Sequence, residues 1–399
     1  MADRAAIAAA TLIFAFTFYQ AVAVNAQPDL FIYRQGAVIG LSGESPYEPS
    51  RIRAAVNEQY PNPDAGPDDF QNNCGFFLPP AAVIVFAPFA VLPWEVARIL
   101  WAVVCGIAAY GVTTLVREGG GTSALRIILP VLLVVNFPTL AIVRMGQTTL
   151  LAVGCIAFGL LCFSRQRPSA GVLLWSVAFV KPHVALPLVP LCWYLFGWKR
   201  AATLVAVVAI ENVFGAVIAG GSPLFLGEYL DFLAAGHKAV AFNLAERNFE
   251  ITSWNRLLCV LTGHVIEQTA TTTLAGYLIW FGLIVGRCAL ANARPSASWA
   301  MAAAATGSAF VPQVLGYEVL ILALAVPWVR ELYQAGFRTH GGLAVLLLAA
   351  QLISFEMFEL LGVTFHRPLC VALFAVLVLF GPIKPLHVSA SVQSPAPDR

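Results

Sequence analysis

Charged residues are scarce in this sequence. Asp, Glu, Lys and Arg together make up 11% of its 399 residues, whereas 59% are hydrophobic and the mean hydropathy is +0.79. A chain with so little polar surface cannot coat a water-soluble globule, so a lipid bilayer must serve as its solvent. Heptads, tandem repeats and low-complexity segments are also missing, apart from a Ser/Pro-rich tail at 389–399 that is typical of a disordered terminus.

The cysteines do not indicate a disulfide framework. Six of the eight lie in apolar runs, where a thiol behaves as a small hydrophobe. Only Cys74 and Cys259 fall in polar segments, and the sequence leaves open whether these two pair.

Long apolar runs recur from residue 5 to residue 384. Because about 20 apolar residues cross a hydrocarbon core, the runs predict an all-α polytopic membrane protein with about 10–13 transmembrane helices. The first run is interpreted as an uncleaved helix rather than a signal peptide, since Phe18 and Tyr19 lie close to the only plausible cleavage site. The predicted crossings are 5–25, 94–116, 125–143, 147–164, 169–181, 183–197, 201–220, 268–290, 299–312, 317–329, 342–361 and 368–384.

The distribution of charge predicts the topology. With both termini in the cytoplasm, the short cytoplasmic segments are rich in Lys and Arg, and most acidic residues fall on the opposite side, as the positive-inside rule requires. Residues 1–388 then form one membrane-embedded domain with extracytoplasmic loops at 26–78 and 221–266, each carrying short helices. The basic residues assigned to the cytoplasm are Arg117, Arg126, Arg165, Arg167, Lys199, Arg200, Arg287, Arg294, Arg330, Arg338 and Lys384.

Two apolar segments are interrupted by proline. The stretch 79–93 is short and bracketed by prolines, so we expect a helix that lies at the membrane surface or dips into it. The stretch 170–198 contains Lys181 followed by Pro182, and this pair favours two short helices over one long tilted helix.

An aspartate, Asp29, follows the first predicted crossing directly. At the membrane surface its carboxylate could accept a proton from an acceptor hydroxyl of a lipid-linked reaction. The alternative is that Asp29 only caps a helix over 30–41, which Pro28 would help to start. The local sequence leaves both open.

Polar residues also interrupt apolar runs further along the chain. Lys181 within an apolar span is costly unless it is functional or paired, and a lipid phosphate is the partner that we expect for it and for the adjacent His183; snorkelling to the interface is the alternative. Arg144 and Gln147 lie in a short outward turn, where they could bind a sugar or a phosphate or simply form a polar turn. Glu318 breaks a later run on the same side and is a second candidate acid, base or ligand.

The two predicted outer loops carry further candidates. Asn255 and Arg256 combine an amide and a cation beside Trp254, a mixture that suits sugars and phosphates but also marks interfacial helices. The acidic cluster in the first loop resembles an ordinary solvated loop, so no metal site is assigned and divalent-metal dependence is left open. Its members are Asp64, Asp68 and Asp69.

Four motifs in order over about residues 25–200 resemble glycosyltransferase family 87, integral-membrane enzymes that include polyprenol-phosphate-mannose-dependent mannosyltransferases. The first motif is Asp29-Leu-Phe-Ile-Tyr33 with Leu41-Ser-Gly43-Glu-Ser-Pro46-Tyr47. The second is Phe77-Leu-Pro-Pro with Phe86-Ala-Pro88 and Pro93; the third is Gly146-Gln147; the fourth is Ala170-Gly171 followed by Lys181-Pro182. In the second half, Tyr317-Glu318 stands where some members have a His-His pair, so the donor or acceptor can differ.

The resemblance implies a GT-C-like helical bundle that transfers a hexose, with mannose expected, from a polyprenyl-phosphate donor to a lipid or glycan acceptor with inversion. Asp29 maps onto the family's general base, and the leaving phosphate would be stabilised by Lys181 with Arg144 or Arg256. Tyr33, Tyr47, Gln147, His183, Asn255, Tyr317 and Glu318 are the substrate-binding candidates. The site would face the periplasm or exterior of the cell inner (plasma) membrane, with membrane lipids as further partners and no nucleic acid.

Two other classes of protein compete with this interpretation. A multi-pass transporter or permease also carries interrupted helices and intramembrane charges, but no inverted repeat is visible and a long acidic loop after the first helix is unusual there. A non-catalytic membrane protein that binds a lipid-linked sugar is the second alternative. Replacing Asp29 separates it from an enzyme, because only an enzyme loses turnover while it retains lipid binding.

Overall fold

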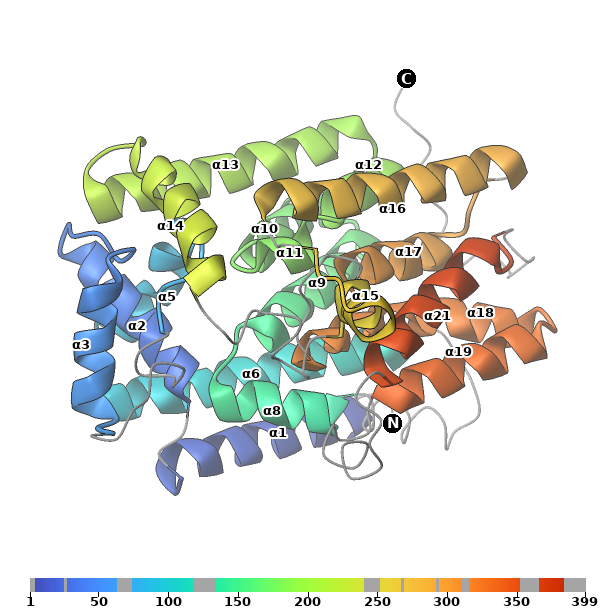
Figure 1. Cartoon of the computed structure of the whole chain (residues 1–399). Coiled ribbons are helices and arrows are strands. Elements are labelled where there is room, and N and C mark those ends of the chain that lie inside the picture. Colours follow the sequence, from blue (N-terminus) through green and yellow to red (C-terminus); the bar gives the residue numbers. More distant parts are fainter. Residues whose placement is uncertain are drawn as a thin grey trace.

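A computed structural model describes residues 4–24, 27–62, 74–117, 134–239, 252–266, 269–291, 294–309, 316–351 and 366–383. Within these ranges every regular element is helical (Figure 1). The helices of the first half are α1 (Arg4–Val22), α2 (Pro28–Leu41), α3 (Pro49–Gln59), α5 (Ala81–Ala90), α6 (Trp94–Arg117), α8 (Phe137–Met145), α9 (Thr149–Ser164), α10 (Pro168–Ala178), α11 (Pro182–Ala185) and α12 (Leu188–Phe196). Those of the second half are α13 (Trp198–Gly220), α14 (Phe225–Ala239), α15 (Trp254–Thr262), α16 (Ala270–Ala291), α17 (Ala297–Ala309), the 3-10 helix η2 (Gly316–Ala325), α18 (Val326–Gln334), α19 (Arg338–Gln351) and α21 (His366–Phe380).

Four helices in the described residues are long and apolar enough to cross a membrane: α1, α6, α13 and α16. The bent pair α8 and α9 would make a fifth span. The predicted all-α membrane class is therefore confirmed. Of the other predicted crossings, those near 125–143, 299–312 and 342–361 are only partly described, and the rest coincide with helices that are shorter than a full span. The predicted acidic cluster and the tail 389–399 lie outside the described residues.

Small residues let the helices of the first half pack closely. Helix α1 lies along α6, which packs on α9, which in turn packs on α10. A Cβ atom at Gly154 of α9 would lie 2.5 Å from the Cβ of Ala108 on α6, so only glycine allows this approach. Close approach through small residues is the usual basis of helix association in lipid, where apolar burial alone gives little driving force.

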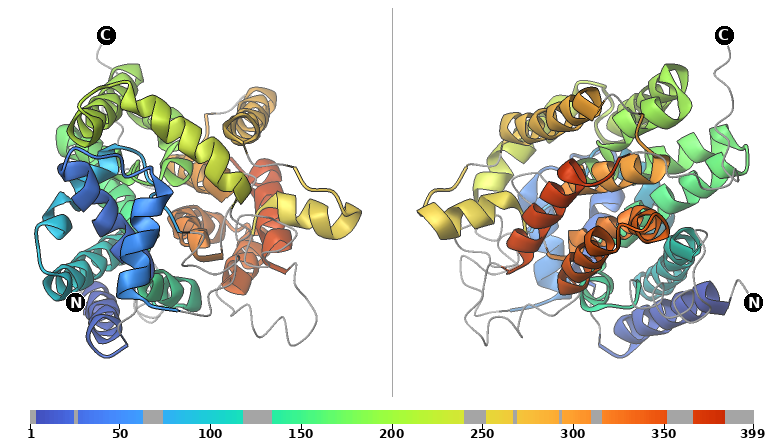
Figure 2. Two further views of the ribbon diagram at one scale, coloured as in Figure 1. Left: turned by 60° about the vertical axis from the view of Figure 1, so that its left-hand side comes forward. Right: turned by 90° about the vertical axis from the view of Figure 1, so that its right-hand side faces the viewer.

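Two helices, α13 and α16, run along one side of the bundle and bury little of their surface (Figures 1 and 2). In their most apolar windows 22% and 17% of residues are buried, against 67% for α6. Their exposed side chains are mainly aliphatic, for example Ile210 and Leu278. A hydrocarbon solvent suits such surfaces, and this distribution agrees with two helices at the lipid boundary.

The short helices of the first predicted outer loop, α2 and α3, gather with α14 at one end of the bundle (Figure 1). Tyr47 connects them: its ring centroid lies 5.3 to 5.8 Å from those of Phe76, Phe225, Tyr229 and Phe232. Aromatic pairs at such distances add to apolar burial. This cluster joins the first outer loop to α14 in the second.

Helix α5 (Ala81–Ala90) is a ten-residue apolar helix with Pro88 inside it, too short to cross the bilayer, in line with the expectation for residues 79–93. It packs against α2 and α13. Arg34 of α2 donates to the carbonyls of Phe89 (3.1 Å) and Leu92 (2.9 Å), which supplies donors for the open carbonyls at the end of α5.

Helical spans break at two places. Helices α8 and α9 meet at an angle of 115° around Gly146, which adopts φ +76° and ends α8. The second break is the segment from Phe179 to Lys181, where α10 ends before Pro182 starts α11. The Lys181-Pro182 sequence predicted this interruption. Within the hydrocarbon region of a membrane, non-helical backbone is tolerated only where protein or a cavity surrounds it. Both breaks are therefore places to look for a site.

Candidate active site

Asp29 lies in the first turn of α2, and it does not cap that helix. Gln27 occupies the cap position and no side chain caps it, whereas the carboxylate of Asp29 accepts a hydrogen bond from Nε2 of Gln147. The side chain is buried, and the N-terminal end of the helix dipole favours a negative charge there. The structure therefore does not support the capping alternative for Asp29.

Gln147 sits in the break between α8 and α9, and the fold brings it to α2. A Cβ at Gly146 would lie 2.7 Å from the Cβ of Leu30, so the glycine allows the break to rest directly on the start of α2. The backbone N–H of Gln27 also donates to the carbonyl of Arg144 at 2.9 Å. These backbone contacts fix the distance between the Gln147 amide and Asp29.

The amide of Gln147 contacts three polar side chains. Its Nε2 donates to Asp29, and its Oε1 accepts from the hydroxyl of Tyr33 at 3.0 Å and from Nζ of Lys181 at 3.4 Å. Tyr33 lies four residues after Asp29 on α2, and i and i+4 side chains share one face of a helix. One neutral side chain thus connects a carboxylate at one end to an ammonium at the other.

Lys181 is buried in the second helix break. Besides Gln147, its Nζ donates to Oγ1 of Thr149 at 2.5 Å and forms an ion pair with Oε1 of Glu318 at 2.7 Å. The side chains of Lys181 and Glu318 are 7% and 6% exposed, so the charge of each is compensated by the other rather than by water. Removing one partner from such a pair is strongly destabilising.

Glu318 lies at the start of η2 and also contacts His183. Nε2 of His183 is 2.7 Å from the same Oε1 that accepts from Lys181. The ring of His183 is 31% exposed, which makes it the most accessible of the three side chains. Its carbonyl accepts a hydrogen bond from the hydroxyl of the buried Tyr277 on α16. A ten-residue 3-10 helix such as η2 is longer than usual, and such stretches often lie at functional positions.

Burial raises the pKa of Asp29 from 3.8 to about 6, although the hydrogen bond from Gln147 and the charge of Lys181 oppose the rise. A carboxyl group with this pKa is mostly ionised at neutral pH, yet it is a stronger base than an ordinary aspartate. Such a value suits a group that accepts a proton during catalysis.

The structure brings six predicted residues into one hydrogen-bonded chain, which we call the polar chain. It runs from α2 through both helix breaks to η2. Its predicted members are Asp29, Tyr33, Gln147, Lys181, His183 and Glu318. Thr149 and Tyr277 also join it and were not predicted, because an isolated threonine or tyrosine in an apolar run carries no distinguishing signal.

The other predicted residues have different surroundings. Tyr47 donates to the carbonyl of Leu78 at 3.0 Å within the aromatic cluster, and Asn255 makes two 2.8 Å hydrogen bonds to the backbone of Ile266, so both stabilise loops. Arg144 is exposed beside the first break.

Arg256 is buried on α15, which packs against α21, and no contact described above joins it to the polar chain. The side chain of Tyr317 lies outside the described residues. Cys74 and Cys259 are both free thiols.

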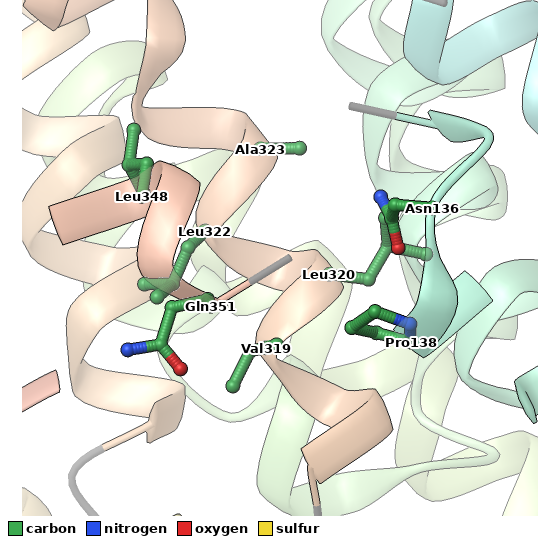
Figure 3. A pocket seen from close by; sticks show the side chains of 8 residues that line it. All are labelled: Asn136, Pro138, Val319, Leu320, Leu322, Ala323, Leu348 and Gln351. Atoms are coloured by element: carbon green, nitrogen blue, oxygen red, sulfur yellow. The ribbon is translucent and has the colours of Figure 1, made fainter. Parts of the chain in front are cut away.

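A separate pocket lies between the start of α8, η2 and α19 (Figure 3). Its volume of about 20 Å³ leaves room for about one water molecule, so no hexose fits it. Gln351 borders it, and Oε1 of that residue is buried without a partner. Within the described ranges no group of three His, Cys, Asp or Glu side chains could hold a metal ion.

The bundle of apolar helices, two of them interrupted, defines an integral-membrane protein. Its buried carboxylate and its buried, ion-paired lysine are joined through Gln147 and form a candidate site for group transfer. The family model for glycosyltransferase family 87 matches residues 76–354, well over half of the chain, and the chain belongs to this family. It is therefore a membrane glycosyltransferase, acting on a sugar donor and an acceptor. The match includes Gln147, Lys181 and Glu318 and begins after the Asp29 segment. No curated protein and no solved structure matches the chain.

Proposed function

We propose that this glycosyltransferase moves a hexose, with mannose the expected sugar, from a polyprenyl-phosphate carrier to a hydroxyl of a lipid or glycan acceptor. The observation that carries the proposal is the link between Asp29 and Lys181 through the single amide of Gln147. A base for the acceptor and a cation for a departing phosphate are the two groups that such a transfer requires.

In the proposed reaction the carboxylate of Asp29 accepts the proton of the acceptor hydroxyl as the hydroxyl oxygen attacks the anomeric carbon. The bond between that carbon and the phosphate oxygen breaks, and its electron pair leaves with the polyprenyl phosphate. A single displacement of this kind inverts the anomeric configuration. The leaving group changes from a phosphodiester with one negative charge to a phosphomonoester with up to two, so the charge to be stabilised grows during the step.

Lys181 is the residue proposed to meet this growing charge. An ammonium has three donors, and in the ligand-free protein they face Thr149 at 2.5 Å, Glu318 at 2.7 Å and Gln147 at 3.4 Å. The contact with Gln147 is the longest, so we expect a phosphate oxygen to replace it. The partly exposed His183 would bind the same substrate group, and Arg144 or Arg256 would contribute only from outside the polar chain.

The proposed location is the cell inner membrane, with both termini in the cytoplasm and the site on the periplasmic or outer side. The charge bias of the connecting segments supports this orientation. A second support is that Asp29, Gln147 and Glu318, which the charge bias assigns to the same side, belong to one hydrogen-bonded chain. We further propose that residues 1–388 form one GT-C-like membrane domain.

The proposal is tested with the full chain in nanodiscs, radiolabelled polyprenyl-phosphate mannose as donor and a host lipid extract as acceptor source. Wild type should transfer label, and Asp29→Asn should lower the rate by roughly 10²–10⁴-fold, the usual contribution of a general base. Glu44→Gln is the matched control, since Glu44 is an exposed carboxylate of the same loop that pairs with Arg51; its rate should equal that of wild type.

Two results would contradict the proposal. If wild type transfers no sugar from polyprenyl-phosphate mannose, glucose or arabinose, the proposed donor class is wrong. If transfer occurs and Asp29→Asn leaves the rate unchanged, the enzyme uses another base.

A further inference from the structure

Gln27 carries a buried side-chain amide that has no hydrogen-bond partner. The residue has no exposed surface, and neither Nε2 nor Oε1 of its amide makes a hydrogen bond. Buried polar atoms without partners are rare in native proteins, and each such atom calls for a reason. Gln27 lies two residues before Asp29 and takes no part in the polar chain.

The backbone of Gln27 is also held in an unfavourable conformation. Its φ of +78° lies in the left-handed region that residues other than glycine seldom adopt. Two backbone hydrogen bonds maintain it: the N–H donates to the carbonyl of Arg144 at 2.9 Å, and the carbonyl accepts from the N–H of Phe31 at 3.1 Å. Strain of this kind persists where the surrounding structure imposes it, and it often lies at binding or catalytic sites.

A second buried polar group without a hydrogen-bond partner, the hydroxyl of Thr148, lies in the same region. Thr148 stands at the cap position of α9 but its side chain caps nothing, and its hydroxyl is buried without a partner. The first helix break connects the two residues, because a Cβ at Gly146 would lie 3.1 Å from the Cβ of Gln27, and Thr148 follows Gly146 by two positions. Thr148 therefore lies next to Gln147, and Gln27 lies two residues before Asp29. The hydroxyl of Thr148 and the amide of Gln27 both have hydrogen-bonding capacity that no partner uses.

We propose that Gln27, with Thr148 beside it, positions the acceptor by hydrogen-bonding a hydroxyl next to the one that Asp29 deprotonates. An amide offers both a donor and an acceptor, which suits neighbouring hydroxyls of a sugar ring. The acceptor class that fits is therefore a glycan or glycolipid with vicinal hydroxyls, rather than an isolated lipid alcohol. This inference depends on the proposed function and specifies its acceptor.

The central test replaces the amide by a side chain of the same length and no polarity, Gln27→Met. If the amide serves the substrate, the variant should melt at or above the temperature of wild type, because an unpaired buried polar group has been removed. It should also need about tenfold more host lipid extract for half-maximal transfer, while the KM for polyprenyl-phosphate mannose stays within about twofold. Thr148→Val should shift the same acceptor value in the same direction by a smaller factor.

Gln166→Met provides a matched control. Gln166 has the only other positive φ among the described non-glycine residues, +58°, and it is exposed after α9. This variant should leave both substrate values unchanged. Gln27→Asn keeps an amide and tolerates the left-handed backbone, so it should recover part of the acceptor affinity that Gln27→Met loses.

The outcomes separate the two proposals. A melting temperature that falls by several degrees in Gln27→Met, with a proportional loss for donor and acceptor, would show a structural amide and overturn this inference. An unchanged acceptor value in an active variant would also overturn it and leave the proposed function intact. If wild type itself transfers no sugar, the proposed function fails, and the acceptor role of Gln27 fails with it.

Discussion

The two buried carboxylates of the polar chain have opposite surroundings. Asp29 receives a hydrogen bond from the neutral amide of Gln147, and burial raises its pKa to about 6 despite that bond. Glu318 lies 2.7 Å from the ammonium of Lys181 and 2.7 Å from the imidazole of His183. A carboxylate that contacts no cationic side chain accepts a proton more readily than a carboxylate that is paired with cationic side chains. The difference supports the proposed role of Asp29 as the base and leaves Glu318 to position the cations in that proposal.

The largest effect is expected from Lys181→Met. The substitution removes the proposed phosphate ligand and leaves the charge of Glu318 buried without its ammonium, so activity should fall by roughly 10²–10³-fold and stability by about 3–5 kcal/mol. Adding Glu318→Gln should restore much of the melting temperature but none of the activity. Recovery of transfer in the double variant would mean that Lys181 has only a structural role.

The two carboxylates should respond in opposite directions when each is replaced by its amide. The rise of the Asp29 pKa from 3.8 to about 6 corresponds to roughly 3 kcal/mol by which the folded protein disfavours the ionised form. Asp29→Asn should therefore stabilise the protein at pH 7.5, while Glu318→Gln should destabilise it. Thermal unfolding in one detergent measures both, and effects of the same sign would remove the distinction between the carboxylates.

The pH dependence of transfer sharpens the comparison. Because Asp29 must be ionised to accept a proton, kcat/KM should fall about tenfold per pH unit below about pH 6. The stability that Asp29 affects should change the other way: its raised pKa means that protonation stabilises the folded state, so stability should increase as the pH falls from about 7 towards 4. A pH-rate profile that is flat between pH 5 and pH 7 would exclude Asp29 as the base.

The smallest effects on the transfer rate are expected from two tyrosines of the first predicted outer loop, and these effects should differ between the two residues. Tyr33→Phe removes the donor to Oε1 of Gln147 and should lower the rate by about tenfold. Tyr47→Phe removes a hydrogen bond to the carbonyl of Leu78 within the aromatic cluster, so transfer should stay within about twofold while the melting temperature falls slightly. Equal losses of activity in both variants would contradict the placement of Tyr47 outside the site.

The sequence predicted the helical membrane class, the break at Lys181-Pro182 and the six residues that the polar chain brings together, whereas it predicted the segment around Gly146 as a turn between two separate crossings and not as a break within one span. Lys181 and Glu318 could be singled out because a charge inside an apolar run stands out against its neighbours, and Asp29 because it follows such a run directly. Tyr47 and Asn255 were less predictable, because aromatic and amide side chains serve loop packing as readily as sugar binding. Hydropathy alone also could not separate helices long enough to span the bilayer, such as α13, from short helices such as α10, since both are apolar.

Gln147 gives the polar chain a direction that depends on no charge of its own. Its amide presents N–H to the carboxylate of Asp29 and oxygen to the ammonium of Lys181. A flipped amide would oppose two acceptors at one end and two donors at the other, so only one orientation is compatible with both neighbours. In the proposed site the base and the cation are consequently joined by a single uncharged residue.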